Sequence, residues 1–176
     1  MVIGENVILD AEQCQELISF AKPKLCDSTL GTAMIGGKKT YAPNKRISQQ
    51  TFKRIGLDDW LFPIINSQLT SLFDLQLKED TRFLCNIIKY PTGGFLYKHD
   101  DTNHEGIRIV GIGNLNEGYE GGDFATPDSV LKPELGNLGW IWPKTIHEVT
   151  KVTSGERWSL VVWIFNHDLV SKNILI

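Results

Sequence analysis

Three side chains, His99, Asp101 and His147, constrain most strongly how this chain can fold. The segment that carries His99 and Asp101 follows a pair of glycines and is predicted to be the end of a strand, where residues i and i+2 point to one face. These two side chains can then converge on one ion, while Asp100 points away. His147 lies in a β-prone segment, residues 145–149, and has to come from a distant strand. The fold must therefore bring two separate strand ends side by side.

Two imidazoles and one carboxylate form the ligand set that holds a non-haem Fe(II) on one face and leaves the opposite positions open for substrate and oxygen. Arg157 stands ten residues after His147 and begins an apolar run, residues 157–165, that is predicted to be a buried strand. A guanidinium at the mouth of such a strand can bind a carboxylate through two parallel hydrogen bonds. Each residue alone has an ordinary explanation as a surface, core or ion-paired side chain, so the order and spacing carry the prediction of an iron oxygenase site.

Further motifs appear in the order in which one known family carries them. Residues 7–18 are similar to that family's opening strand and helix, and residues 46–48 to its Arg-Thr-Ser segment. Residues 90–93, Tyr-Pro-Thr-Gly, match its Tyr-x-x-Gly, and residues 115–124 its Leu-Asn-x-x-Tyr-x-Gly-Gly-Glu stretch. Residues 147–157 are close to its His-x-Val-x-x-Val-x-x-Gly-x-Arg/Lys signature. Over nearly its whole length the chain resembles the 2-oxoglutarate- and Fe(II)-dependent oxygenases of the prolyl 4-hydroxylase type.

The resemblance implies roles for particular residues. His99, Asp101 and His147 would bind Fe(II), Arg157 would bind the distal carboxylate of 2-oxoglutarate, and Tyr90 would add a hydroxyl to that carboxylate. Additional substrate or pocket candidates are Trp163, Tyr41, Arg46 and Asn114. For Tyr90 and Trp163, packing in the core is the competing explanation. The chain departs from the family at Asn114 and Leu96, where the family often carries aromatic residues, and Arg157 replaces a frequent Lys.

The activity implied by the resemblance is a dioxygenase with Fe(II) as cofactor and 2-oxoglutarate and O₂ as cosubstrates. Succinate and CO₂ would be released, and ascorbate is a candidate reductant. The implied substrate is a prolyl residue in a peptide or protein. Two alternatives remain open: a hydroxylase of another side chain, free amino acid or small metabolite, and a non-catalytic jelly-roll binding module. A module that only bound a partner would have no use for a cosubstrate clamp such as Arg157.

Composition places the chain among ordinary globular proteins. Hydrophobic residues make up 41 % and charged residues 22 % of the 176 residues. The net charge of −3 argues against a nucleic-acid partner. No secretory leader and no run long enough to span a membrane is found, so we expect a cytoplasmic enzyme without a membrane partner. The three cysteines are scattered and are expected to be buried free thiols.

The expected fold is mainly β with flanking α-helices, and its core is a double-stranded β-helix, or jelly roll. We predict one domain over residues 1–176, with a mainly helical part, 1–80, and a jelly-roll core, 81–176. Asp10 is a candidate N-cap for a helix that stops before Pro23, and residues 57–77 form a second predicted helix, in which Pro63 is tolerable if it lies in the first turn. After Arg82, short β-prone segments alternate with turn residues, as in a sandwich or barrel.

Basic residues are concentrated between Gly37 and Arg54, where no acid occurs. The simplest interpretation is a solvated loop. The alternative is that residues 36–44 form a glycine-hinged flap over the site, in a region where the family resemblance places a substrate-covering loop. Tyr41 and Arg46 would then help to hold the substrate.

Overall fold

The computed structural model describes residues 3–27, 32–35, 38–41, 46–102, 105–131 and 134–170. Of residues 3–7, 32–35 and 38–41 it describes the backbone alone. The helices are α1 (Ala11–Ala21), η1 (Lys22–Lys24), α2 (Leu61–Phe73) and η3 (Asn166–Asp168). The strands of the first half are β1 (Ile3–Val7), β2 (Cys26–Asp27), β3 (Thr32–Ile35), β4 (Lys38–Tyr41), β5 (Arg46–Ile47), β6 (Gln49–Ile55), β7 (Phe83–Tyr90) and β8 (Phe95–His99). Those of the second half are β9 (Ile107–Asn114), β10 (Glu120–Gly121), β11 (Phe124–Thr126), β12 (Ser129–Leu131), β13 (Asn137–Ile141), β14 (His147–Val149), β15 (Val152–Ser154) and β16 (Arg157–Phe165).

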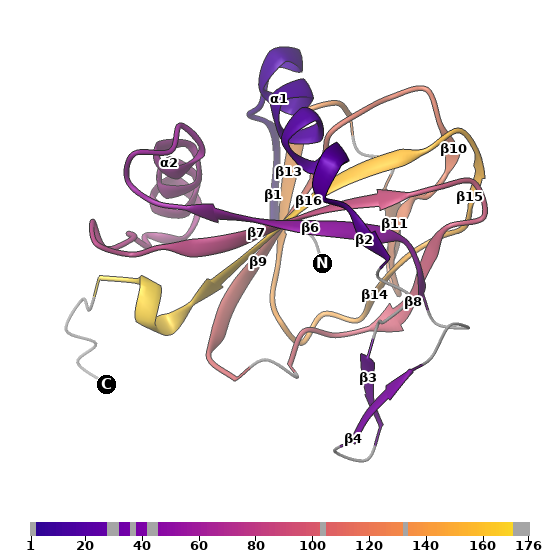
Figure 1. Ribbon diagram of the computed structural model, residues 1–176. Coiled ribbons are helices and arrows are strands. Elements are labelled where there is room, and N and C mark those ends of the chain that lie inside the picture. The colour runs from indigo at the N-terminus through magenta and orange to yellow at the C-terminus, as the bar shows by residue number, and fades with distance from the viewer. Residues whose placement is uncertain are drawn as a thin grey trace.

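Two antiparallel sheets form the predicted jelly roll. The larger sheet has the strand order β1-β13-β9-β16-β7-β6-β2, and the smaller has the order β12-β11-β14-β8-β5. Helices α1 and α2 lie on one side of the larger sheet, and β8, β11 and β14 of the smaller sheet lie on the other (Figure 1). The large sheet therefore has one face toward the helices and one face toward the interior of the jelly roll.

Strand β16 shows how the sequence separates these two faces. Trp158, Leu160 and Val162 point to the main core, where they pack with residues of α1 and α2. The alternate residues point to the interior of the jelly roll, and they are Arg157, Ser159, Val161 and Trp163. Because side chains of a strand alternate between faces, a charged residue at the first interior position does not disturb the apolar face.

Helix α1 begins where the sequence predicts, whereas α2 begins at Leu61, four residues after its predicted start. Asp10 is the N-cap of α1: its side chain accepts a hydrogen bond from the Gln13 backbone N–H, and the Gln13 side chain accepts one from the Asp10 N–H. Helix α2 is shorter than the predicted 57–77 but keeps Pro63 in its first turn. It ends at Asp74, whose left-handed backbone (φ 53°) terminates the helical hydrogen bonds.

The first 80 residues differ from the expected mainly helical part, because they also contain strands β1 to β6. Strand β6 pairs with β7 along its whole length and so belongs to the larger sheet. Strand β6 lies near the sheet edge, and several of its side chains are partly exposed. These positions carry glutamines and basic residues, so the sequence shows no clear strand pattern there. The prediction of one domain over 1–176 stays a prediction.

The basic segment is not one long loop. Residues 46–54 lie mainly in β5 and β6, and β3 pairs with β4 as an antiparallel hairpin. Gly36, Gly37 and residues 42–45 lie outside the described residues, so the flap stays a prediction. Of the three free cysteines, Cys14 and Cys85 are buried as expected, whereas Cys26 is exposed. Within the described ranges no helix is both long and apolar enough to cross a membrane.

Candidate metal centre

His99, Asp101 and His147 converge at adjacent ends of β8 and β14. The two histidines are directly paired in the smaller sheet, with ring centroids 4.1 Å apart. One potential ligand atom from each of the three residues lies within 4.8 Å of the others, and His147 Nε2 is 3.7 Å from Asp101 Oδ2. Among the described residues this is the one group of three or more such side chains close enough to share a metal ion.

Each histidine is oriented by the backbone carbonyl two residues before it. His99 Nδ1 lies 2.9 Å from the Tyr97 carbonyl oxygen, and His147 Nδ1 lies 2.8 Å from that of Thr145. A carbonyl oxygen only accepts hydrogen bonds, so Nδ1 of each neutral ring carries the proton and donates it. Both Nε2 lone pairs are then available to a metal ion, which is the usual arrangement for metal-binding histidines.

The surroundings favour the neutral, metal-binding form of His147. Burial lowers the pKa of its imidazole, and the neighbouring His99 lowers it further. The Phe124 ring, with its centroid 5.4 Å from that of His147, covers part of the imidazole. The sequence analysis missed Phe124, although it is one of the interior-facing residues of β11.

Asp101 reaches the centre from the loop after β8, one step beyond the predicted strand end. Its backbone N–H donates a hydrogen bond to the Pro143 carbonyl at 2.9 Å, which ties this loop to the segment before β14. The Asp101 side chain is buried, as the expected convergence requires. Asp100 instead accepts hydrogen bonds from the hydroxyl and backbone N–H of Thr102, and the hydroxyl contributes most to lowering the pKa of the Asp100 carboxyl.

Arg157 and Tyr90 face each other across β16 and β7, in the interior of the jelly roll. They are paired in register, and the guanidinium carbon lies 5.6 Å from the centre of the Tyr90 ring. Arg157 has no exposed surface and Tyr90 is 2 % exposed. Arg157 Nη2 makes one long contact, 3.5 Å, to Ser159 Oγ, whereas Nε and Nη1 are buried without a hydrogen-bond partner among the described residues.

The other predicted site residues have mixed surroundings. Trp163 is half-buried on the interior face of β16, with its ring centroid 6.5 Å from that of Phe52. Arg46 donates hydrogen bonds to Ser48 Oγ and Gln50 Oε1. Asn114 is buried, accepts a hydrogen bond from the Tyr119 hydroxyl and donates one to the Asn116 carbonyl. The backbone of Tyr41 lies in β4, and its side chain is outside the described part.

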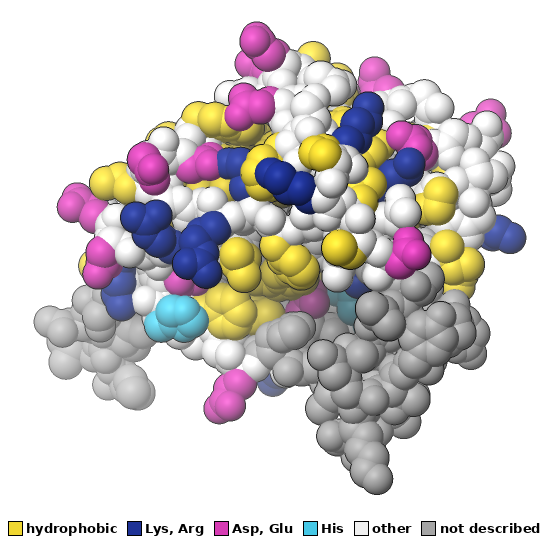
Figure 2. Space-filling model, viewed as in Figure 1, with side chains coloured by type: hydrophobic (Ala, Val, Ile, Leu, Met, Phe, Trp, Pro, Cys, Tyr) yellow, Lys and Arg dark blue, Asp and Glu magenta, His cyan; other side chains and the backbone are white. Residues whose placement is uncertain are grey.

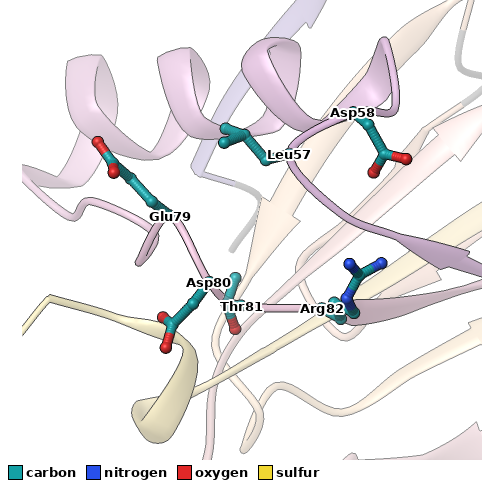
Figure 3. A pocket seen from close by; sticks show the side chains of 6 residues that line it. All are labelled: Leu57, Asp58, Glu79, Asp80, Thr81 and Arg82. Atoms are coloured by element: carbon teal, nitrogen blue, oxygen red, sulfur yellow. The ribbon is translucent and has the colours of Figure 1, made fainter.

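A separate cavity of about 400 Å³ lies between the loop before α2 and the start of β7. It is lined by Leu57, Asp58, Glu79, Asp80, Thr81 and Arg82 (Figure 3). None of these six residues belongs to the candidate centre. The cavity is open to solvent, and its acids do not form a metal-binding group.

The residues present fit an iron ion with an anionic cosubstrate. Two imidazole nitrogens and one carboxylate leave part of the coordination sphere open, as an iron oxygenase requires. The guanidinium of Arg157 is fully buried, and two of its nitrogens have no partner among the described residues, so it favours an anion beside it because an uncompensated buried charge is costly.

Comparison with known proteins gives a consistent result. Residues 85–165 match the family model of the 2OG-Fe(II) oxygenase superfamily. None of the curated proteins matches the chain. Solved structures with a similar fold include a Pseudomonas putida prolyl-4-hydroxylase, at 19 % identity and a TM-score of 0.67, covering 92 % of this chain and 91 % of that chain.

Two further structures are similar over comparable lengths. One is the viral collagen prolyl hydroxylase of Paramecium bursaria Chlorella virus-1 in a 2OG complex, at 20 % identity and a TM-score of 0.64, covering 91 % of this chain and 93 % of that chain. The other is a Trichoplax adhaerens prolyl hydroxylase in complex with a peptide fragment of hypoxia inducible factor, at 18 % identity and a TM-score of 0.66, covering 95 % and 83 %. At these identities the likeness establishes the shared fold.

Proposed function

Because residues 85–165 match the family model of the 2OG-Fe(II) oxygenase superfamily, we propose that this protein is an Fe(II)- and 2-oxoglutarate-dependent dioxygenase that hydroxylates prolyl residues in a peptide or protein. The observation that carries the proposal is that one jelly roll contains a His-Asp-His group and a buried guanidinium, whose Nε and Nη1 have no hydrogen-bond partner among the described residues. Fe(II) and 2-oxoglutarate together supply the chemistry: one atom of O₂ enters a C–H bond of the substrate and the other enters succinate as CO₂ leaves.

The protein's part is to position the reactants. His99 and His147 present Nε2 to the metal because their Nδ1–H groups are held by backbone carbonyls. Asp101 adds the carboxylate and neutralises part of the charge of the ion. The three ligands come from one side, the smaller sheet and its adjoining loop, so the opposite side faces the interior of the jelly roll.

Arg157 selects the cosubstrate. A buried guanidinium binds a carboxylate through charge-assisted hydrogen bonds, and its fixed geometry favours two parallel bonds over one. Tyr90, which is paired with Arg157 in register, would add its phenol hydroxyl to the same carboxylate. In this proposal a 2-oxo acid with a second carboxylate binds Arg157 at one end and the metal at the other.

The prolyl substrate is supported by the resemblance in motifs and by the fold shared with three prolyl hydroxylases. Ascorbate remains a candidate reductant. The decisive test is to incubate the Fe(II)-loaded protein with 2-oxoglutarate and a library of proline-containing peptides. We expect mass spectrometry to find products that have gained one oxygen on proline. Oxidation of free amino acids or metabolites, with none of peptides, would replace the prolyl substrate by the small-molecule alternative.

Gly122 offers a test of the Arg157 site in which the side chains of Arg157 and Tyr90 are not themselves mutated. Its φ is +66°, and a Cβ there would lie 3.1 Å from Arg157 Cδ and 2.9 Å from Val152 Cγ2. Gly122→Ala should displace the guanidinium and raise the dissociation constant for 2-oxoglutarate about tenfold, through partial loss of charge-assisted bonds. Calorimetric titration of the metal-loaded protein measures the change.

Gly118→Ala is the matched control. Gly118 also has a positive φ, +78°, but an added Cβ would meet nothing within 4 Å. Both variants should lose stability from backbone strain, and Gly122→Ala should lose more because of its close contacts. Only Gly122→Ala should lose affinity for 2-oxoglutarate. Equal affinities for 2-oxoglutarate in the two variants would contradict the assignment of Arg157 to the cosubstrate site.

A further inference from the structure

Asn86 is a buried polar residue on the interior face of the larger sheet. Ile88 and Tyr90, on the same face of β7, pack inside the jelly roll, whereas Cys85 and Ile87 point to the helices. In register, Asn86 lies between Phe52 of β6 and Val161 of β16. It is 2 % exposed and stands four residues from Tyr90, toward the end of the strand where Leu84 becomes exposed.

Neighbouring hydrogen bonds fix which way the Asn86 amide points. Gln50 Oε1 accepts hydrogen bonds at 3.0 Å from both Arg46 Nη2 and Asn86 Nδ2. A guanidinium only donates, so the Gln50 atom between them must be the oxygen. The Asn86 atom that meets this oxygen must then be the NH₂ group, and Asn86 presents its own oxygen on the other side.

This Asn86 Oδ1 is buried and has no hydrogen-bond partner among the described residues. Such an unpaired acceptor is unfavourable unless a bound molecule donates to it. The dianion of 2-oxoglutarate has no N–H or O–H group, so it cannot supply the donor. The interior therefore presents two opposite groups: Arg157 offers hydrogen-bond donors, and Asn86 offers an acceptor that 2-oxoglutarate cannot use.

The surroundings of Asn86 indicate what kind of molecule this is. Phe52 and Leu84 are 49 % and 43 % exposed, and the Phe52 ring lies beside Trp163. Hydrophobic side chains gather near the middle of the face on which β6 runs in front, with basic side chains close by (Figure 2). An apolar ring or aliphatic group can cover these side chains while a neighbouring N–H reaches Asn86.

Charge favours a neutral N–H over an ammonium group as the donor to Asn86. Arg46 reaches Gln50, and Arg54 lies on the same face of β6 as Phe52, without an ion pair to any described residue. An ammonium group next to Asn86 would add a further positive charge beside this guanidinium pair. A neutral backbone N–H carries no such penalty.

We propose that Asn86, oriented by Gln50, is a specificity-determining residue that accepts a hydrogen bond from a backbone N–H flanking the target residue of a peptide substrate. This inference rests on the proposed function and names the contact by which the peptide is recognised. Proline itself has no N–H, so the donor belongs to a neighbouring residue of the peptide.

The test uses the proline-containing peptide that the wild-type protein oxidises best, with both ends capped, and a series of copies each N-methylated at one backbone nitrogen. Binding is measured calorimetrically to the Fe(II)- and 2-oxoglutarate-loaded protein without O₂. In the wild type, methylation at one nitrogen should weaken binding about tenfold or more, since it leaves a buried acceptor unpaired. Asn86→Leu should weaken binding of the parent peptide about 5- to 100-fold and bind the parent and that methylated copy equally.

Two companion variants complete the test. Gln50→Leu removes the hydrogen bond that orients the Asn86 amide, so it should reduce the loss of affinity caused by methylation. Asn66→Leu is the control, because Asn66 lies elsewhere and accepts a hydrogen bond from the Leu77 N–H; it should leave that loss unchanged. Affinity for 2-oxoglutarate should stay constant in Asn86→Leu. A methylation penalty of the same size in wild type and Asn86→Leu, or no penalty in the wild type, overturns the role of Asn86 alone. Absence of any peptide oxidation by the wild type overturns the proposed substrate and the peptide contact with it.

Discussion

Asp101→Ala is expected to abolish 2-oxoglutarate-dependent turnover, whereas Asp100→Ala should retain most of it. The three ligands act as one unit, so loss of one removes the ion from its working geometry. Asp101 belongs to the group whose ligand atoms lie within 4.8 Å of one another, whereas the Asp100 carboxylate accepts hydrogen bonds from Thr102. Succinate formation measured at saturating Fe(II) and 2-oxoglutarate separates the two variants.

A direct metal-binding measurement accompanies this comparison. Mn(II), used as a paramagnetic probe in place of Fe(II), should bind the wild type and Asp100→Ala but bind Asp101→Ala, His99→Ala and His147→Ala much more weakly. Circular dichroism establishes that each variant is folded. If Asp100→Ala lost as much activity and metal affinity as Asp101→Ala, the assignment of the carboxylate ligand would be wrong.

Arg157→Ala should raise the 2-oxoglutarate concentration needed for half-maximal activity by roughly ten- to more than a hundredfold. A hydrogen bond to a charged group is worth about 1.5–3 kcal/mol, and a bidentate pair lies at the upper end. Arg157→Lys should retain part of the affinity because it keeps the charge but loses the fork. Calorimetry on the metal-loaded protein gives the affinity independently of turnover.

Two variants guard against misinterpretation of that result. Arg157→Met keeps most of the buried volume without the charge, so it should match Arg157→Ala in affinity while staying closer to wild type in stability. Arg82→Ala removes a guanidinium from the acid-lined cavity and should leave 2-oxoglutarate binding unchanged. Unaltered binding in a folded Arg157→Met protein would disprove the clamp.

The parts of the fold that the sequence predicts are those with a strong local pattern. Asp10 and Gln13 form their capping box from adjacent residues, and the apolar run of β16 is a buried strand. Likewise, the His-x-Asp pair and His147 come together because strands β8 and β14 pair directly. Strand β6 was missed because its half-exposed, polar side chains carry no clear period, and its place is set by pairing with β7.

The same limit applies to the site. The role of Arg157 is predicted from its spacing to His147 and stays a prediction. The orientation of Asn86 depends on a series of hydrogen bonds from Arg46 through Gln50, on two other strands. The residue pattern within β7 alone does not predict these hydrogen bonds. Asp101 was placed on a strand, although it lies in a loop fixed by the Pro143 carbonyl, because a backbone contact across the site leaves no trace in side-chain pattern.

The hydrogen bonds that orient the two histidines come from the main chain at positions 97 and 145. Every amino acid carries the same carbonyl, so a substitution at either position leaves the imidazole tautomers unchanged as long as the strand keeps its path. Changes of nearby side chains therefore do not alter which nitrogen of each histidine faces the proposed metal. Exposed side chains of the smaller sheet, such as Tyr97, can therefore be replaced without changing which nitrogen of each proposed metal-binding histidine is free to bind the ion.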